Sequence, residues 1–298
     1  MRLVTRGDLD GLTSAVILTE CEKIDEILLV HPQDITDKKV TITRDDIFAN
    51  LPYHPEVGKW FDHHLLTESN ERPPAKFEGR YGLAPSAAHL VYEYYLEKKP
   101  EIRRFEKLVA ETDRLDTAQL TRDDVLDPKD YILLGFTLDP RTGLGAFQPY
   151  FVALVGWLKR ISIQEVLQQK EVQERIGRMR DQDQRFRELT QAHSRLDGNV
   201  LFTDFRNVRP IPVGNRFIVY TLFPEVNISL RVHPGPDPEH VAATIGHSIF
   251  NRTSRTNVGE LMSRYGGGGH RAAGTCLLSA VRADQQIGEL LDAMKRDG

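Results

Sequence analysis

The first 160 residues alternate between short apolar runs and longer segments in which apolar residues recur at helical spacing. This pattern predicts helices at 12–21, 86–97 and 102–112, and strands at 2–5, 26–31, 40–43, 47–50 and 59–61. Strands that alternate with helices are typical of an α/β domain with a mostly parallel sheet flanked by helices. Because ligands bind beyond the carboxyl ends of such strands, we expect the site among the residues that follow them.

The rest of the chain has a different pattern. Residues 161–196 predict a long charged helix or helix pair, because apolar residues keep a narrow stripe at helical spacing. Beyond it, strands are predicted at 200–205, 216–223, 227–232 and 275–278, and helices at 239–250, 258–264 and 282–296. We therefore expect three parts: an α/β domain over 1–160, a helical connector over 161–196, and a smaller α+β domain over 197–298.

Composition narrows the class of protein. A chain of 298 residues favours two domains, and its net charge of -4 lacks the overall basic character of nucleic-acid binders. Cys21 and Cys276 indicate reduced thiols and no disulfide framework. The charged N-terminus does not resemble a signal peptide, and the longest apolar stretch is too short to span a bilayer. We expect a cytoplasmic protein with no membrane association.

Two carboxylates follow the first predicted strand. If the chain is extended there, the side chains of Asp8 and Asp10 share one face and can reach one cation or two neighbouring cations. The alternative is a turn in which the carboxylates cap the amides of the next helix. The sequence leaves both interpretations open.

A carboxylate and two imidazoles follow another strand, as Asp62, His63 and His64. Imidazole and carboxylate suit Mn²⁺ or Zn²⁺, and a ligating histidine needs a partner that fixes its tautomer. A surface turn is the alternative. Asp113 and Asp116 follow the predicted helix at 102–112 and are either surface acids or further members of the site.

The C-terminal part carries a glycine-rich segment. Gly267, Gly268 and Gly269 allow backbone amides to approach phosphate oxygens, and His270 and Arg271 add side-chain donors. A flexible loop is the alternative.

An upstream segment at 251–257 is dense in hydrogen-bond donors. Asn251 and Arg252 are candidate phosphate contacts in it, and an ordinary polar loop is the alternative.

Four motifs occur in order along the chain: RGDLDG (6–11), FDHH (61–64), TDRLD (112–116) and GGGGHRAAG (266–274). With them, the chain resembles the DHH phosphoesterase superfamily, metal-dependent phosphohydrolases with an N-terminal α/β domain and a DHH-associated C-terminal domain. The segments NLPYHP, DPRTGLG and IFNRTSRTNVGELM resemble the branch labelled exopolyphosphatase-related. The resemblance covers nearly the whole chain, and the ordered set is more specific than any one motif.

The resemblance implies roles for residues of the first domain. It assigns Asp8 to one metal position and Asp10, His63 and Asp113 to the other, with Mn²⁺ or Mg²⁺ as the metal. It also implies that His64, His270 and the glycine segment face the phosphate.

We predict that Arg6, Asp62 and His64 are catalytic. Asn251, Arg252, Gly267, Gly268, Gly269, His270 and Arg271 are predicted to bind substrate.

Two positions depart from the family pattern. The family usually has a histidine ligand where this chain has Arg6, and a bridging aspartate where the best match is Asn50. Asp34, Asp45 and Asp46 are candidate substitutes that fit the strand-end position less well. One metal position is therefore intact and the other depleted, and we hypothesise that Arg6 partly replaces the missing cation.

The predicted function is hydrolysis of a phosphate ester or anhydride. A bound Mn²⁺ or Mg²⁺ would make a water molecule more acidic and shield phosphoryl charge. The substrate is a short oligonucleotide, a cyclic dinucleotide, a phosphonucleotide or polyphosphate; a homodimer is left open. The alternative is a sensor that binds a nucleotide or phosphate without turning it over.

Overall fold

The computed structural model describes residues 1–64, 66, 71–138, 143–211 and 213–298. Residues 139–142 of the DPRTGLG segment lie outside this description. The chain divides into two compact units. The N-terminal unit contains Met1–Leu120 and Pro128–Ile176, and the C-terminal unit contains Thr121–Asp127 and Gly177–Gly298. The division falls inside one continuous helix, α9 (Lys170–His193).

The N-terminal unit contains a five-stranded sheet in the order β2-β1-β3-β4-β5, and every pair of neighbouring strands is parallel. The predicted α/β class is therefore confirmed. Thr5 pairs with Ala49, and Ala49 pairs with Phe61, so three central strands end at the same level. The strands are β1 (Arg2–Thr5), β2 (Glu26–Leu29), β3 (Asp46–Ala49), β4 (Lys59–Asp62) and β5 (Glu78–Tyr81).

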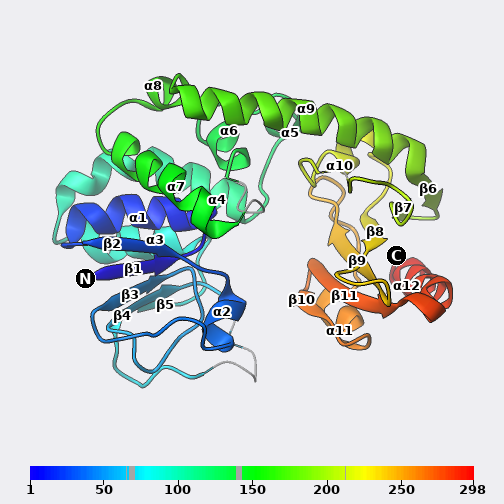
Figure 1. The fold of residues 1–298 in the computed structure, drawn as a ribbon, viewed down its shortest axis with the longest axis horizontal. Coiled ribbons are helices and arrows are strands. Elements are labelled where there is room, and N and C mark those ends of the chain that lie inside the picture. Colours follow the sequence, from blue (N-terminus) through cyan, green and yellow to red (C-terminus); the bar gives the residue numbers. More distant parts are fainter. Residues whose placement is uncertain (65, 67–70, 139–142, 212) are drawn as a thin grey trace. The chain divides into compact units, whose positions relative to one another are not determined.

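Helices cover both faces of this sheet. In Figure 1, α1 and α7 lie on one side, and α1 also contacts α3 and α4. The helices of this unit are α1 (Leu9–Cys21), α2 (Pro32–Thr36), α3 (Ala87–Leu96), α4 (Glu106–Asp116), α6 (Asp130–Phe136), α7 (Leu144–Leu158) and α8 (Ile163–Leu167), with a 3₁₀ segment at Pro100–Phe105.

An apolar cluster that includes α2 covers the other face of the sheet. Val4, Phe48 and Trp60 come from three adjacent strands and pack with Ile35 of α2. The Trp60 ring stacks on Tyr81 with ring centroids 4.8 Å apart. Val4 pairs with Phe48, and Phe48 pairs with Trp60, so the three side chains lie on the same face of the sheet.

The C-terminal unit contains a six-stranded sheet in the order β10-β11-β9-β8-β7-β6. Only the β7–β8 pair of this sheet is parallel. The strands are β6 (Ser194–Asp197), β7 (Val200–Asp204), β8 (Ile228–Pro234), β9 (His240–His247), β10 (Gly268–His270) and β11 (Ala273–Ser279). The helices are α5 (Arg122–Leu126), α10 (Val219–Leu222), α11 (Val258–Ser263) and α12 (Ala283–Asp297), with a 3₁₀ segment at Ala280–Arg282.

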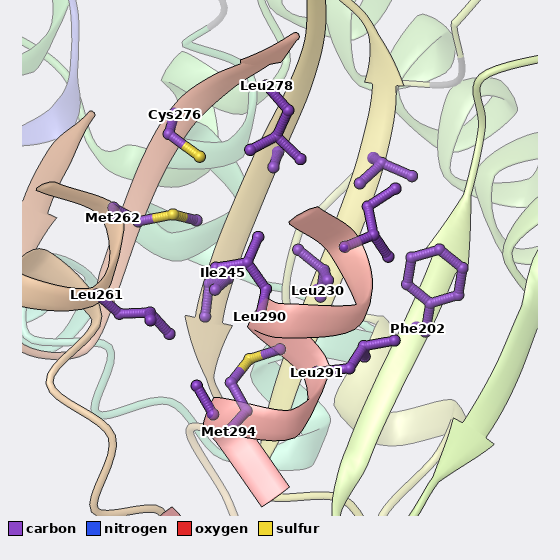
Figure 2. Packing of buried hydrophobic residues seen from close by; sticks show 14 of the residues in the cluster. Phe202, Leu230, Ile245, Leu261, Met262, Cys276, Leu278, Leu290, Leu291 and Met294 are labelled. Atoms are coloured by element: carbon purple, nitrogen blue, oxygen red, sulfur yellow. The ribbon is translucent and has the colours of Figure 1, made fainter. Parts of the chain in front are cut away.

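Helix α12 packs its apolar face against one side of this sheet. Figure 2 shows Leu290 and Leu291 of α12 beside Leu230 of β8 and Ile245 of β9. These side chains are buried, and burying each contributes about 1.5–3 kcal/mol to stability. Met262 of α11 fills the same cluster from the edge near β11.

Three predicted elements of the chain are wrong. The segment at 40–43 forms no strand, although the structure describes every residue of it. Residues 216–223 form turns and the short helix α10, and most of 239–250 forms strand β9, where a helix was expected. In β9 partly buried and fully buried positions alternate from His240 to Ile245, the period of a strand. The alanines in it are strong helix formers, but pairing with β8 and β11 overrides that propensity.

Three strands were not predicted. β6 begins inside the segment 161–196, which was expected to be helical. The other two, β5 and β10, carry weak strand signals. β5 contains Gly79 and few apolar residues, and β10 consists of two glycines and a histidine. Glycine is depleted in strands, so the sequence alone gives no reason to expect them.

No helix within the described ranges is long and apolar enough to cross a membrane.

Neither cysteine of the described chain forms a disulfide. Burial raises the pKa of Cys21 to about 12 and that of Cys276 to about 11, so both thiols stay protonated at neutral pH. Because the thiolate is the reactive form, we expect iodoacetamide to alkylate each at least about tenfold more slowly in the folded protein than in urea. Peptide mass spectrometry of timed samples resolves the two sites. Equal rates in both states would contradict the burial.

Candidate metal centre

The acids predicted from the sequence gather at the carboxyl ends of three adjacent strands. Asp8 and Asp10 lie at the start of α1, just beyond β1. Asn50 directly follows β3, and Asp62 is the last residue of β4. Because these strands end at the same level, polar side chains from distant parts of the sequence meet at one edge.

Asp10 is a buried carboxylate held by the first turn of another helix. Only 2% of the residue is exposed, and its oxygens accept hydrogen bonds from the amides of Ala87 (2.9 Å) and Ala88 (2.7 Å) in α3. The amides at a helix N-terminus stabilise negative charge. Even so, burial and the charges of Asp116 and Asp8 raise the pKa of Asp10 well above its ordinary value. A neighbouring cation would reverse this effect.

His63 presents an unpaired ring nitrogen to these acids. Its Nδ1 lies 3.1 Å from the carbonyl oxygen of Ala84, which can only accept, so we assign the proton to Nδ1 and the lone pair to Nε2. Nε2 lies 3.3 Å from Asp116 Oδ2 and 3.7 Å from Asp10 Oδ2. This nitrogen is buried, and none of the described residues forms a hydrogen bond with it. A histidine fixed in this way by a carbonyl is ready to bind a metal.

Asp10, His63 and Asp116 together fit a divalent cation. Each offers one ligand atom, and these atoms all lie within 4.8 Å of one another. Burial raises the pKa of Asp116, and the charge of Asp8 adds to this, although His63 acts in the opposite direction. A bound cation would stabilise the charged forms of Asp10 and Asp116, whose pKa values are raised. It would also accept the lone pair of the buried His63 Nε2, which has no hydrogen-bond partner among the described residues.

Asp113 lies outside this group, contrary to the ligand set that the resemblance implied. Its Oδ1 accepts a hydrogen bond from Ser86 Oγ at 2.6 Å, and its Oδ2 accepts one from His89 Nδ1 at 2.8 Å. Asp113 and Asp116 are three residues apart on α4, and only the tertiary fold determines which one reaches His63. We therefore propose Asp116 as the ligand and Asp113 as a support for the first turn of α3.

The amides that hold Asp10 were not predicted as part of the site. Ser86 is the N-cap of α3, where its side chain accepts a hydrogen bond from the amide of His89. A serine before an apolar helical segment is a recognised start signal, but it does not reveal which carboxylate the free amides bind.

Asp62 holds His64 and shapes the turn that follows β4. It is 1% exposed, and its Oδ1 accepts hydrogen bonds from His64 Nδ1 at 2.7 Å and from the amide of His63 at 3.0 Å. Burial alone would lower the pKa of His64, but the bond to Asp62 and its charge outweigh this effect and raise that pKa. Asp62, His63 and His64 also offer ligand atoms within 4.8 Å of one another. We propose that Asp62 orients His64.

Asp8 caps α1, as the alternative interpretation expected, and is also held from two other sides. Its Oδ1 accepts from the amide of Gly11 at 2.9 Å and from Asn50 Nδ2 at 3.0 Å. Its Oδ2 lies 3.1 Å from Arg6 Nε. A Cβ on Gly11 would lie 2.1 Å from the carbonyl oxygen of Arg6, so only glycine fits this turn.

The candidate substitutes for Asn50 lie elsewhere. Asp46 is the first residue of β3, at the opposite end from Asn50, and pairs with Arg2 at 2.7 Å. Asp45 precedes it, and Asp34 lies in α2, where its side chain forms part of the capping box. None of these three carboxylates replaces Asn50 at the strand end.

The glycine-rich segment of the C-terminal unit forms the β10–β11 hairpin, which the sequence did not predict. A Cβ on Gly267 would lie 2.1 Å from the carbonyl oxygen of Thr275, and Gly269 has a φ of 155°. Close strand pairing therefore requires glycine at both positions. Gly268, His270 and Arg271 are exposed.

The upstream candidates lie in the same unit. Asn251 Nδ2 donates to the carbonyl of Glu225 at 3.2 Å, and Arg252 Nε donates to the carbonyl of Ile249 at 3.0 Å. Arg252 is exposed, so its side chain stays accessible to a ligand.

Solved structures share this fold. The pGpG-specific phosphodiesterase PggH from Vibrio cholerae has 40% identity and a TM-score of 0.83, with 100% of this chain and 99% of that chain covered. RecJ from Thermus thermophilus, in complex with Mn²⁺, has 12% identity and a TM-score of 0.60, with 99% of this chain and 52% of that chain covered. The DHH domain of a member of a ribosomal-protein family has 15% identity and a TM-score of 0.58, with 99% of this chain and 85% of that chain covered. Neither a family model nor a curated protein matches the chain.

The chain belongs to the DHH phosphoesterase superfamily and is a hydrolase of that class. The resemblance drawn from the four sequence motifs is confirmed. Within the superfamily, the similarity to PggH extends over the full chain, including both units.

Proposed function

We propose that this protein is a metal-dependent phosphodiesterase that hydrolyses pGpG or a closely related linear dinucleotide. The main observation in support is that Asp10, His63 and Asp116 form a group that fits a divalent cation. The choice of substrate is supported by 40% identity over the whole chain to a pGpG-specific phosphodiesterase.

The metal that we propose is Mn²⁺. One imidazole and two carboxylates suit Mn²⁺ better than Mg²⁺, which prefers oxygen ligands alone. RecJ, which shares the fold, has been solved with each of these two metals. When bound, the ion would supply Lewis-acid chemistry: it would shield phosphoryl charge and make a water molecule more acidic.

The reaction consumes one water molecule for each dinucleotide. The water oxygen forms a bond to the bridging phosphorus, the bond from phosphorus to the 3′ oxygen breaks, and that oxygen takes up a proton. With pGpG the products are two molecules of GMP. We propose that His64, held by Asp62, donates a hydrogen bond to a phosphoryl oxygen, since the raised pKa favours its protonated form.

Substrate contacts in the C-terminal unit remain a prediction. We propose Asn251 and Arg252, together with the β10–β11 hairpin residues Gly267, Gly268, Gly269, His270 and Arg271. In support, Gly268, His270, Arg271 and Arg252 are exposed, and glycine lets a ligand approach the backbone.

A substrate panel tests the proposed function. Purified protein with Mn²⁺ is offered pGpG, pApA, cyclic di-GMP, polyphosphate and a long single-stranded RNA, and products are separated by ion-exchange chromatography. We expect kcat/KM for pGpG to exceed that for cyclic di-GMP or polyphosphate by about 100-fold or more. Chelation with EDTA should abolish turnover, and added Mn²⁺ should restore it.

Two results would contradict this proposal. Preferred hydrolysis of polyphosphate would favour polyphosphate, another of the substrates that the sequence left open, over a dinucleotide. Tight binding of pGpG without turnover, unchanged by EDTA, would favour the sensor.

A further inference from the structure

The Asp8 carboxylate is held by three donors from this chain. Gly11 and Asn50 donate to Oδ1, and the Arg6 guanidinium lies against Oδ2. A carboxylate in contact with a guanidinium already has its charge compensated. Asp8 therefore needs no second cation. Asp10 differs, because its neighbours are backbone amides, other acids and the His63 imidazole.

Asn50 is one of the three donors that hold the Asp8 carboxylate. The residue is 1% exposed and has a φ of 61°, a left-handed conformation that asparagine tolerates better than most residues. Its Nδ2 is 3.0 Å from Asp8, while its buried Oδ1 has no hydrogen-bond partner within the part of the chain that the structure describes. An aspartate here would place two carboxylates in contact and would require a cation between them. Asparagine donates to Asp8 and removes that requirement.

Arg6 also lies close enough to act on the metal centre. Its guanidinium contacts Asp8, the N-cap of α1, and the proposed ligand Asp10 lies in the first turn of the same helix. Its side chain is 36% exposed, so part of the guanidinium faces solvent and is accessible to an anion. A planar guanidinium binds two phosphoryl oxygens at once.

From this geometry we propose that the centre holds one divalent ion, at Asp10, His63 and Asp116, and that the Arg6 guanidinium takes the place of a second cation. Asp8 and Asn50 are then positioning residues: Asp8 fixes the guanidinium, and Asn50 fixes Asp8. The inferred contact between Arg6 and a phosphoryl oxygen rests on the proposed phosphodiesterase function. The inferred ion count does not.

Metal content tests the ion count directly. The wild-type protein is saturated with Mn²⁺ and desalted, and manganese is measured by mass spectrometry and by electron paramagnetic resonance. We expect about one ion per chain with the spectrum of an isolated Mn²⁺, and about two spin-coupled ions in the double variant R6H/N50D, which restores an imidazole and a carboxylate. Two coupled ions in the wild-type protein would overturn the inference, even if the double variant fails to fold.

Arg6→Gln tests the role of the guanidinium. We expect this variant to keep about one Mn²⁺ and to lose about 100-fold or more in kcat on pGpG, since a guanidinium that stabilises phosphoryl charge contributes at least this much. Arg104→Gln is the matched control, because Arg104 forms a surface ion pair with Glu20 at 2.8 Å and should leave kcat unchanged. An unchanged kcat in Arg6→Gln would overturn the contact with phosphate.

A wild-type protein that binds one ion but cleaves no dinucleotide would overturn the proposed function and support the ion count.

Discussion

We expect the His63→Ala variant to bind no Mn²⁺ and to hydrolyse the proposed substrate, pGpG, about 10⁴-fold or more slowly, the scale of losing an essential catalytic group. The reason is local. Nε2 is a buried, unpaired nitrogen 3.3 Å from Asp116 and 3.7 Å from Asp10, and its removal leaves two acids facing each other. Both effects are measurable, as GMP release by chromatography and as manganese per chain by mass spectrometry.

Thermal unfolding supplies a further measurement for the same variant. A ligand that binds only the folded state raises the unfolding temperature, so Mn²⁺ should stabilise the wild-type protein and leave His63→Ala unchanged. His240→Ala is a suitable control, because His240 pairs with Asp237 on the surface of the C-terminal unit. If His63→Ala retained both its manganese and its activity, the proposed centre would be incorrect.

Asp116→Asn should impair metal binding, whereas Asp113→Asn should impair the stability of the fold. We expect Asp116→Asn to weaken Mn²⁺ binding by about 100-fold or more and to lose activity, because losing a ligand costs at least as much as losing a residue that supports one. Asp113→Asn should keep its metal. Its amide would face Ser86 or His89 with a donor in place of an acceptor, so the free energy of unfolding should fall by about 1–3 kcal/mol.

Calorimetric titration with Mn²⁺ and urea unfolding separate these two outcomes. The comparison is well matched, because both substitutions remove one carboxylate from the same helix, α4. If Asp113→Asn lost the metal while Asp116→Asn kept it, the family pattern would be right about the ligand, and the arrangement of Asp113 with Ser86 and His89 would have to change on metal binding.

The α/β class of the N-terminal unit and its strands β1, β3 and β4 followed from sequence because their signals are local and agree. β1, β3 and β4 are short apolar runs, and each ends close to a polar residue of the site. The segment at 239–250 shows where such signals fail. Its alanines favour a helix, but the hydrogen bonds that β8 and β11 provide on both sides stabilise a strand. Strand pairing depends on segments that are distant in the sequence, so a local pattern of residues cannot predict it.

The glycine segment shows a second limit. Its composition was compatible with a phosphate-binding loop or a flexible connection, and both interpretations explain glycine by its missing side chain. The structure adds a third reason, since Gly267 and Gly269 allow β10 to pair closely with β11. The three reasons do not exclude one another, because exposed backbone beside Gly268 can still contact a ligand.

The sequence by itself determined the superfamily and the α/β class, and it supplied the residues from which the proposed centre is drawn, because motif order and hydrophobic periodicity are properties of the linear chain. Only the tertiary structure decided how those residues are paired. It placed Asp116 and not Asp113 beside His63, and it enclosed Asp8 between Arg6 and Asn50. These pairings depend on which helix faces which strand end. Asp113 and Asp116 are three residues apart on α4 and therefore lie on the same face of the helix, so only the packing of α4 determines which of them reaches His63.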